Sequence, residues 1–204
     1  EADTLEIDLI DSATGILVTL YYSVFHDLGV MTRHVRIENR SENSCRLERA
    51  LSLCLDLPAM NYDLITLYGR HCRERNYARR PLARGLQGIE SKRGSSSHTQ
   101  NPFTALVSRG ADEDHGWCYG FNLVYSGNFT AMAECDFNAT TRFIMGIAPT
   151  DFSWKLEPGE SFHTPEAVMV FSDKGLGEMS RIFHRFYDHN LIRGRWKTEK
   201  RPLL

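Results

Sequence analysis

Apolar and polar residues alternate along most of this chain. Between Leu5 and about Val170, apolar side chains recur at every second position, as in the stretch from Val18 to Val24. Alternation with a period of two is typical of β-strands that bury one face. Residues 11–15 (Asp-Ser-Ala-Thr-Gly) separate two such stretches and have the composition of a tight turn. The pattern therefore predicts a β-hairpin at the start of the chain.

Further short stretches repeat this alternation, and each is bounded by Asn, Gly, Ser, Asp or Pro. They cover residues 35–38, 47–57, 64–68, 119–125, 129–135, 143–147 and 167–171. Many short strands about 8–12 residues apart, without helices between them, are typical of antiparallel sheets that close on each other as a sandwich or barrel. A parallel α/β fold needs a helix between strands and is therefore excluded. We predict an all-β fold.

The pattern changes once, after Asp173. Apolar residues then recur at the spacing of one helical stripe, at Leu176, Met179, Ile182, Phe183 and Phe186. We predict a helix that runs to about Asn190, with Ser172 or Asp173 as its N-cap. A basic tail follows the helix.

Composition adds limits to this picture. The chain has 204 residues, 42% of them hydrophobic, and a formal net charge of −2, which is ordinary for a globular domain and argues against a nucleic-acid binder. No stretch of about 18 apolar residues could form a transmembrane helix. The five cysteines are scattered without a close pair, so we expect reduced thiols, no zinc site and a cytoplasmic location.

Isolated motifs do not identify a catalytic or metal site. His184 and Asp188 lie four residues apart on one face of the predicted helix, but no third ligand is evident. The sequence has no strained Gly-x-Ser-x-Gly turn and does not single out a pair of carboxylates. Residues 112–116 (Asp-Glu-Asp-His-Gly) are predicted to form a charged hairpin turn. We therefore expect no metal and assign no catalytic residue from these motifs.

A basic stretch precedes the most polar segment of the chain. Between Arg70 and Arg93 there are eight basic residues against Glu74 and Glu90. Guanidinium groups bind phosphates, but they bind sugar hydroxyls, carboxylates and facing subunits equally well. Because acidic residues elsewhere balance this charge, we expect a surface between domains or subunits rather than a nucleic-acid site.

Residues 93–103 (Arg-Gly-Ser-Ser-Ser-His-Thr-Gln-Asn-Pro-Phe) combine three hydroxyls, an imidazole and two side-chain amides. We expect a loop here that ends in a turn at the proline. Its composition suits hydrogen bonds to a polyhydroxylated ligand or to a partner loop. A surface loop whose polar groups bond one another is the alternative that the sequence leaves open.

Several longer motifs occur in order along nearly the whole chain. They are residues 93–98 with 101–103, 119–128 (Tyr-Gly-Phe-Asn-Leu-Val-Tyr-Ser-Gly-Asn), 151–160 (Asp-Phe-Ser-Trp-Lys-Leu-Glu-Pro-Gly-Glu), 164–166 (Thr-Pro-Glu), and 195–196 with 201–202 (Arg-Trp and Arg-Pro). Together they resemble the amino-terminal domain of bacterial α-galactosidases of glycoside hydrolase family 36. The resemblance implies an antiparallel β-supersandwich of the galactose-mutarotase type over residues 1–172, truncated at its N-terminus. It also implies one helix and a basic linker over residues 173–204, with Pro202 to Leu204 matching the last residues before a (β/α)8 catalytic barrel outside this chain.

The resemblance also implies a function. Family members hydrolyse terminal α-D-galactosyl residues of raffinose-type oligosaccharides with retention, using two aspartates that both lie on the barrel. This chain is therefore expected to contain no catalytic residue, to need no cofactor and to be inactive alone. The expected partners are raffinose, melibiose and stachyose, the catalytic barrel of the same protein and further copies in a homo-tetramer. Nucleic acids and membranes are not expected partners.

Within this chain, the resemblance implies contacts with substrate or barrel from a few residues. The candidates are Tyr62, Arg93, Ser95, Ser96, Ser97, His98 and Asn101. Trp154 shares a strand face with Phe152 and Leu156 and is expected in the core, whereas Trp196 is expected to pack against the barrel. The alternative function is that of a free-standing carbohydrate-binding β-sandwich module.

Overall fold

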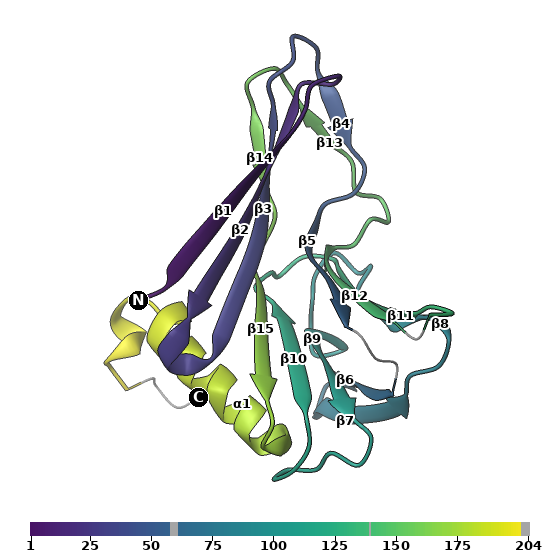
Figure 1. Ribbon diagram of the computed structural model, residues 1–204. Coiled ribbons are helices and arrows are strands. Elements are labelled where there is room, and N and C mark those ends of the chain that lie inside the picture. Colours follow the sequence, from purple (N-terminus) through teal and green to yellow (C-terminus); the bar gives the residue numbers. More distant parts are fainter. Residues whose placement is uncertain (58–60, 139, 201–204) are drawn as a thin grey trace.

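Antiparallel strands form most of the protein in the computed structural model, which describes residues 1–57, 61–138 and 140–200 (Figure 1). The segment Pro202 to Leu204 lies outside the described residues. Two sheets pack face to face, and a helix near the carboxyl end covers the other side of the larger sheet. The all-β sandwich that the alternating pattern predicts is confirmed.

The larger sheet has nine strands within the described residues. They are β1 (Asp3–Asp11), β2 (Ile16–Phe25), β3 (Val30–Asn39), β6 (Tyr62–Arg70), β7 (Arg73–Pro81), β9 (Gln100–Ser108), β10 (Cys118–Leu123), β14 (Ser161–His163) and β15 (Ala167–Ser172). Their order is β1-β2-β3-β15-β10-β9-β6-β7, with β14 also paired to β3. The predicted hairpin is β1 and β2, joined by a turn in which Gly15 takes a φ of 72°, a value that suits glycine.

The smaller sheet lies across one part of the larger one. Its four strands, in order, are β5 (Leu51–Leu57), β12 (Thr141–Ile147), β11 (Phe129–Cys135) and β8 (Gly85–Glu90), and a separate pair joins β4 (Cys45–Leu47) to β13 (Trp154–Leu156). The core between the sheets contains fully buried rings, of which Phe121 and Phe143 stack with centroids 4.0 Å apart. Side chains from alternate positions of facing strands supply this core, as in other sandwiches.

Helix α1 (Gly175–Phe186) packs on the outer face of the larger sheet through Met179, Ile182 and Phe183. Short helical turns occur at η1 (His26–Leu28), η2 (Tyr187–Leu191) and η3 (Arg195–Lys197). The predicted helix is confirmed, with η2 continuing it to about its predicted end. No helix in the described part of the chain is long and apolar enough to cross a membrane.

The predicted cap of this helix is wrong. The N-cap position is Lys174, which makes no side-chain capping bond, and the hydroxyl of Ser172 accepts a hydrogen bond from the Lys174 N–H. Instead, the N–H groups of Leu176 and Gly177 donate to the carbonyls of residues 112 and 113, each at 2.9 Å. A neighbouring loop therefore supplies the acceptors that a capping side chain would otherwise provide.

The predicted loop with a proline turn is partly wrong, because β9 already begins at Gln100. Pro102 lies inside this strand, where the pairing with β6 shifts register and the pairing with β10 has not yet begun. Its missing N–H therefore removes no bond from the ladder. The Pro102 carbonyl accepts a hydrogen bond from the side-chain amide of Asn122 at 2.9 Å.

The basic stretch contains strand β7, which the alternation did not predict. This strand forms one edge of the larger sheet, and most of its side chains are exposed. Charged side chains on an edge strand discourage pairing with other chains. Trp154 also differs from its prediction, since it is half exposed and contacts Phe162 at a centroid distance of 5.3 Å, whereas Leu156 is buried.

Candidate functional site

A groove of about 370 Å³ lies between helix α1 and the outer face of strands β6, β7 and β9. Ile65, Phe103 and Phe183 form part of its apolar wall, and Tyr77, which is half exposed, lines it from the edge strand. Small-molecule sites usually have volumes of about 300–1,000 Å³ and mostly apolar walls with a few polar groups. The groove has these properties.

Strand geometry decides which polar groups line the groove. Alternate residues of β9 point to opposite faces of the larger sheet. Asn101 and Phe103 therefore lie on the same face as Ala105, which packs against α1. Asn122 lies opposite Phe103 on β10. Its side-chain oxygen accepts a hydrogen bond of 2.7 Å from the hydroxyl of Tyr187, whose pKa is raised by burial. The polar atoms at this end of the groove are therefore already paired.

Other polar groups of the groove have no protein partner. Among the described residues, the side chains of Arg75, Glu113, Ser180 and His184 make no hydrogen bond or ion pair, although all four line the groove. The Asn101 side-chain nitrogen is buried and also lacks an acceptor. These groups offer a cationic donor, a carboxylate acceptor, a hydroxyl, an imidazole and an amide. Such a set can bind a ligand that both donates and accepts hydrogen bonds.

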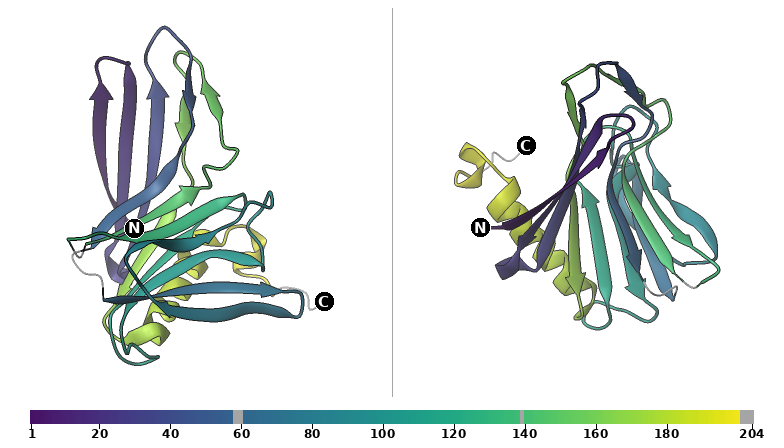
Figure 2. Two further views of the ribbon diagram at one scale, coloured as in Figure 1. Left: turned by 90° about the vertical axis from the view of Figure 1, so that its right-hand side faces the viewer. Right: turned by 45° about the horizontal axis from the view of Figure 1, so that its top comes forward.

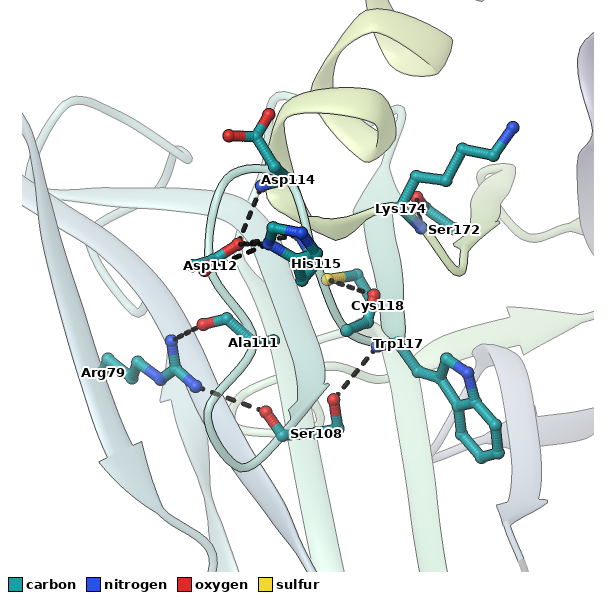
Figure 3. A network of polar contacts seen from close by, with 11 residues as sticks. Arg79, Ser108, Ala111, Asp112, Asp114, His115, Trp117, Cys118, Ser172 and Lys174 are labelled. Atoms are coloured by element: carbon teal, nitrogen blue, oxygen red, sulfur yellow. Dashed lines mark hydrogen bonds and ion pairs between the residues drawn. The ribbon is translucent and has the colours of Figure 1, made fainter.

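Figure 3 shows the turn between β9 and β10, with Asp112, Asp114 and His115 drawn as sticks. Glu113 belongs to this turn and lines the groove. Arg79 on β7 holds this turn through hydrogen bonds to the carbonyl of Ala111, at 2.5 Å, and that of Ser108, at 3.3 Å. It also pairs with Asp63 at 2.8 Å. Within the turn, Asp112 accepts backbone N–H bonds from residues 114 and 115, which lower the pKa of its carboxyl. The charged hairpin turn predicted here is confirmed.

The polar loop before β9 is bonded to a second loop from the family motifs. The hydroxyl of Ser96 donates to the carbonyl of Tyr125 at 3.1 Å, and its N–H donates to the carbonyl of Ser126 at 2.9 Å. The Gly94 N–H donates to the side chain of Asn128 at 2.7 Å. These polar groups therefore bond a second loop of the same chain, which is the kind of partner loop that the composition suits.

Some loop side chains nevertheless remain free. Ser97 accepts a hydrogen bond from the Thr99 N–H at 3.2 Å, so its oxygen is partly used. Arg93, Ser95 and His98 are exposed, and their side chains make no hydrogen bond or ion pair within the described ranges. These three are the side chains of the loop that could reach another molecule.

Tyr62 lies away from the other predicted residues. Its ring is buried in the core between the sheets and meets Tyr119 edge-on at 6.1 Å, and burial raises the pKa of its hydroxyl. On the β6–β9 ladder Tyr62 lies opposite Ser108, at the far end from Gln100. The structure therefore places Asn101 in the groove and Tyr62 in the core, and does not bring them together.

The sequence did not indicate the roles of Arg75, Glu113 and His184 in this groove. Each belongs to a motif that was noticed for another reason, namely the basic stretch, the charged turn and the helical pair with Asp188. Only the docking of α1 on the sheet brings them together. No group of three or more His, Cys, Asp or Glu side chains among the residues described is placed to hold a metal ion.

Comparisons with known proteins give a consistent result. Residues 1–157 match the family described as glycosyl hydrolase family 36 N-terminal domain, and residues 161–204 match the family described as melibiase. The chain is 52% identical over all its 204 residues to α-galactosidase AgaA of Geobacillus stearothermophilus. It spans only 28% of the length of that relative.

Solved structures of variants of the same relative have the same fold. One, in complex with stachyose, superposes with a TM-score of 0.96 at 51% identity. Another, in complex with raffinose, superposes with a TM-score of 0.97 at 51% identity. Both comparisons cover 100% of this chain and 28% of the solved one.

Proposed function

This chain belongs to glycosyl hydrolase family 36, and from that membership we propose that it is the amino-terminal, non-catalytic part of an α-galactosidase. The longer protein would hydrolyse terminal α-D-galactosyl residues of raffinose-type oligosaccharides with retention. The observation that carries the proposal is the identity to an α-galactosidase over every part of the chain. Raffinose and stachyose, which bind to variants of that relative, are the expected substrates, together with melibiose.

The proposal includes a division of the chain. Residues 1–172 would belong to a larger supersandwich, and residues 173–204 would lead through α1 and a basic linker to a (β/α)8 barrel with both catalytic aspartates. The start of α1 at Gly175, close to that boundary, supports this division. We expect the longer protein to be a cytoplasmic homo-tetramer that needs no cofactor.

The role of the present residues would be to contact the barrel or the sugar beyond the galactose. The free side chains of Arg93, Ser95 and His98 support such a role for the loop, and the unpaired amide of Asn101 supports it for the groove. Ser96, Ser97 and Tyr62 have less to offer a ligand, because their polar or aromatic groups are used within the protein.

A comparison of activities tests the proposal. The longer protein is expected to hydrolyse an aryl α-galactoside and raffinose, whereas the 204-residue chain alone hydrolyses neither. In the longer protein, His98→Ala is expected to lower kcat/KM for raffinose about 5- to 20-fold and to leave the aryl galactoside less affected, because only raffinose presents sugar hydroxyls beyond the galactose. Arg84→Ala is the matched control, since Arg84 is exposed, lies outside the loop and has no side-chain partner among the described residues.

A longer protein without α-galactosidase activity would overturn the proposal. The free-standing carbohydrate-binding module is the second candidate, and the unpaired polar groups of the groove favour it. Titration of the 204-residue chain with raffinose distinguishes the two functions. Binding that is lost in Asn101→Ala, together with a longer protein that lacks hydrolytic activity, would favour the module.

A further inference from the structure

The groove beside α1 lies on the outer face of the larger sheet. Figure 2 (right) shows α1 on one side of this sheet and the smaller sheet on the other, so the groove is separate from the core between the sheets. Its volume of about 370 Å³ is sufficient for a small molecule. A ligand in the groove would contact segments that are far apart in the sequence, from β6 to α1.

The floor of the groove is apolar. Leu176, Met179 and Phe183 form one stripe of α1, and the ring of Phe103 on β9 meets that of Phe183 edge-on at a centroid distance of 5.7 Å. Tyr77 on the edge strand β7 also lines the groove and is 50% exposed. An exposed aromatic ring beside an apolar floor offers a surface on which the C–H groups of a ligand can pack.

Polar side chains without a protein partner surround this floor. Ser180 and His184 are four residues apart and therefore lie on one face of α1. Arg75 lines the groove from β7, and Glu113 lines it from the β9–β10 turn. Asn101 on β9 adds a buried amide nitrogen without an acceptor. Hydrogen-bonding groups from several elements therefore meet around one apolar surface.

The charges of these side chains narrow the class of ligand. Among the described residues that line the groove, Arg75 is the one arginine or lysine and Glu113 is the one carboxylate, so their formal charges cancel. A phosphate or carboxylate ligand would place a like charge near Glu113, and an ammonium ligand would place one near Arg75. The groove therefore favours a neutral ligand whose hydroxyls both donate and accept hydrogen bonds.

A sugar ring in the pyranose form has the properties that the groove requires. Its faces carry C–H groups, which pack on an aromatic ring, and its rim carries hydroxyls. We propose that the groove binds one pyranose ring of a raffinose-type oligosaccharide, with a face of the ring against Tyr77 and hydroxyls bonded to Arg75 and Glu113. The polar side chains of α1 and Asn101 supply further partners. The choice of a raffinose-type sugar rests on the proposed function, whereas the choice of a pyranose rests on the groove itself.

Hydrogen bonds within the protein hold the walls of the groove in place. The carbonyl of Glu113 accepts a hydrogen bond from the N–H of Gly177 at 2.9 Å, which fixes the turn against the start of α1. At the other end of the helix, the bond from Tyr187 to Asn122 fixes η2 to β10. A site whose walls are already bonded loses little conformational freedom when a ligand binds.

Hydrogen exchange in the presence of raffinose tests the proposal, on the longer protein and on the 204-residue chain. Raffinose at tens of millimolar is expected to slow amide exchange at least about threefold in residues 108–117 and 175–187, and to leave β11 and β12 unchanged. Arg75→Ala is expected to weaken this binding at least about tenfold, because a charged hydrogen-bond donor is lost. Arg73→Ala is the matched control, since Arg73 is exposed on the same strand and does not line the groove.

A second pair of variants tests packing of the sugar on the aromatic ring. Tyr77→Ala is expected to weaken raffinose binding at least about fivefold. Tyr68→Ala is its matched control, because Tyr68 on the neighbouring strand is 47% exposed and does not line the groove. Thermal unfolding followed by circular dichroism identifies the variants that remain folded, and only these are compared.

Unchanged exchange of both segments with raffinose would overturn the proposal, and so would equal effects of Arg75→Ala and Arg73→Ala on binding. The groove is occupied by another part of the protein if both segments exchange at least about tenfold slower in the longer protein without sugar and raffinose adds no protection there. That result would also overturn the proposal. Hydrolysis of an aryl α-galactoside by the longer protein, measured on the same samples, reports on the proposed function separately.

Discussion

At the scale of single residues, buried side-chain amides and ionisable groups connect segments that are far apart in sequence. Asn39 is fully buried at the end of β3, and its amide nitrogen donates to the carbonyls of Asn43, at 2.8 Å, and Leu156, at 3.0 Å. Its oxygen accepts hydrogen bonds from the N–H and hydroxyl of Ser41. One side chain thus joins the larger sheet to the β4–β13 pair. Sequence spacing does not indicate the bond to Leu156, because only the fold brings that residue to Asn39.

His34 is expected to make stability depend on pH. It stacks on Tyr21 with centroids 4.4 Å apart and also faces His163, Glu166 and Glu6. Burial lowers the pKa of His34, and Glu166 raises it by a smaller amount. The stability linked to this low pKa is therefore fully present above the unfolded value of about 6.5 and is lost as pH falls through the folded value.

The His34→Gln variant removes this dependence. Urea unfolding between pH 5 and pH 7.5 is expected to show a smaller acid loss of the free energy of unfolding in His34→Gln than in the parent. Glu166→Gln acts in the opposite direction, because it removes the attraction that raises the pKa of His34 and so increases the acid loss. If the free energy of unfolding falls equally with pH in all three proteins, His34 is not the source of the acid loss.

At the scale of elements, α1 is positioned by contacts with its neighbours. Its apolar stripe is visible in the sequence, but its start is set by the β9–β10 turn, whose carbonyls accept the first helical N–H groups. Its depth on the sheet is set by Gly120 on β10. A Cβ at that position would lie 2.6 Å from the ring of Phe183 and 2.8 Å from the sulfur of Met179.

Gly120→Ala is therefore expected to destabilise the protein. Overpacking of this kind costs about 1–3 kcal/mol, which thermal and urea unfolding can measure. Adding Phe183→Leu to Gly120→Ala is expected to recover part of the loss, because the nearest contact is with that ring. If the double variant is less stable than Gly120→Ala by the amount that Phe183→Leu costs alone, the two changes are independent. That result would contradict a close contact between position 120 and the Phe183 ring.

At the scale of the whole molecule, the two sheets share one core. Phe121 from the larger sheet and Phe143 from the smaller sheet stack across the interface, and both are fully buried. The strands that bring them together come from distant parts of the chain, since β5, β8, β11 and β12 alternate in sequence with strands of the larger sheet. Each sheet therefore contains strands from both halves of the chain.

Phe143→Ala is expected to lower the free energy of unfolding by about 3–5 kcal/mol, because it leaves a cavity in this shared core. Phe137→Ala is the matched control, since Phe137 is 83% exposed in the turn between β11 and β12, the strand that carries Phe143. A change below about 0.5 kcal/mol in the free energy of unfolding is expected there. Near- and far-ultraviolet circular dichroism should follow one transition in both variants. Two separate transitions would contradict a shared core.

Elements that depend on neighbours in the sequence were predicted, and features that depend on distant strands were not. Alternation along β2, β11 and β15, the helical stripe of α1 and the turn composition of residues 11–15 predicted these elements, because each depends on neighbours in the sequence. Strand β7 was not predicted, since an edge strand rich in arginine has no apolar alternation. Pro102 led to the wrong prediction of a turn, because only the partner strands show that it lies at a register shift within β9.

The sequence by itself therefore determined the fold class and, through its long motifs, the family. Tertiary structure alone decided that Arg75, Glu113 and His184 meet in one groove, that Ser96 is bonded to a second loop, and that Tyr62 lies in the core. The reason is that periodicity depends on local geometry, whereas a site depends on which distant segments pack together.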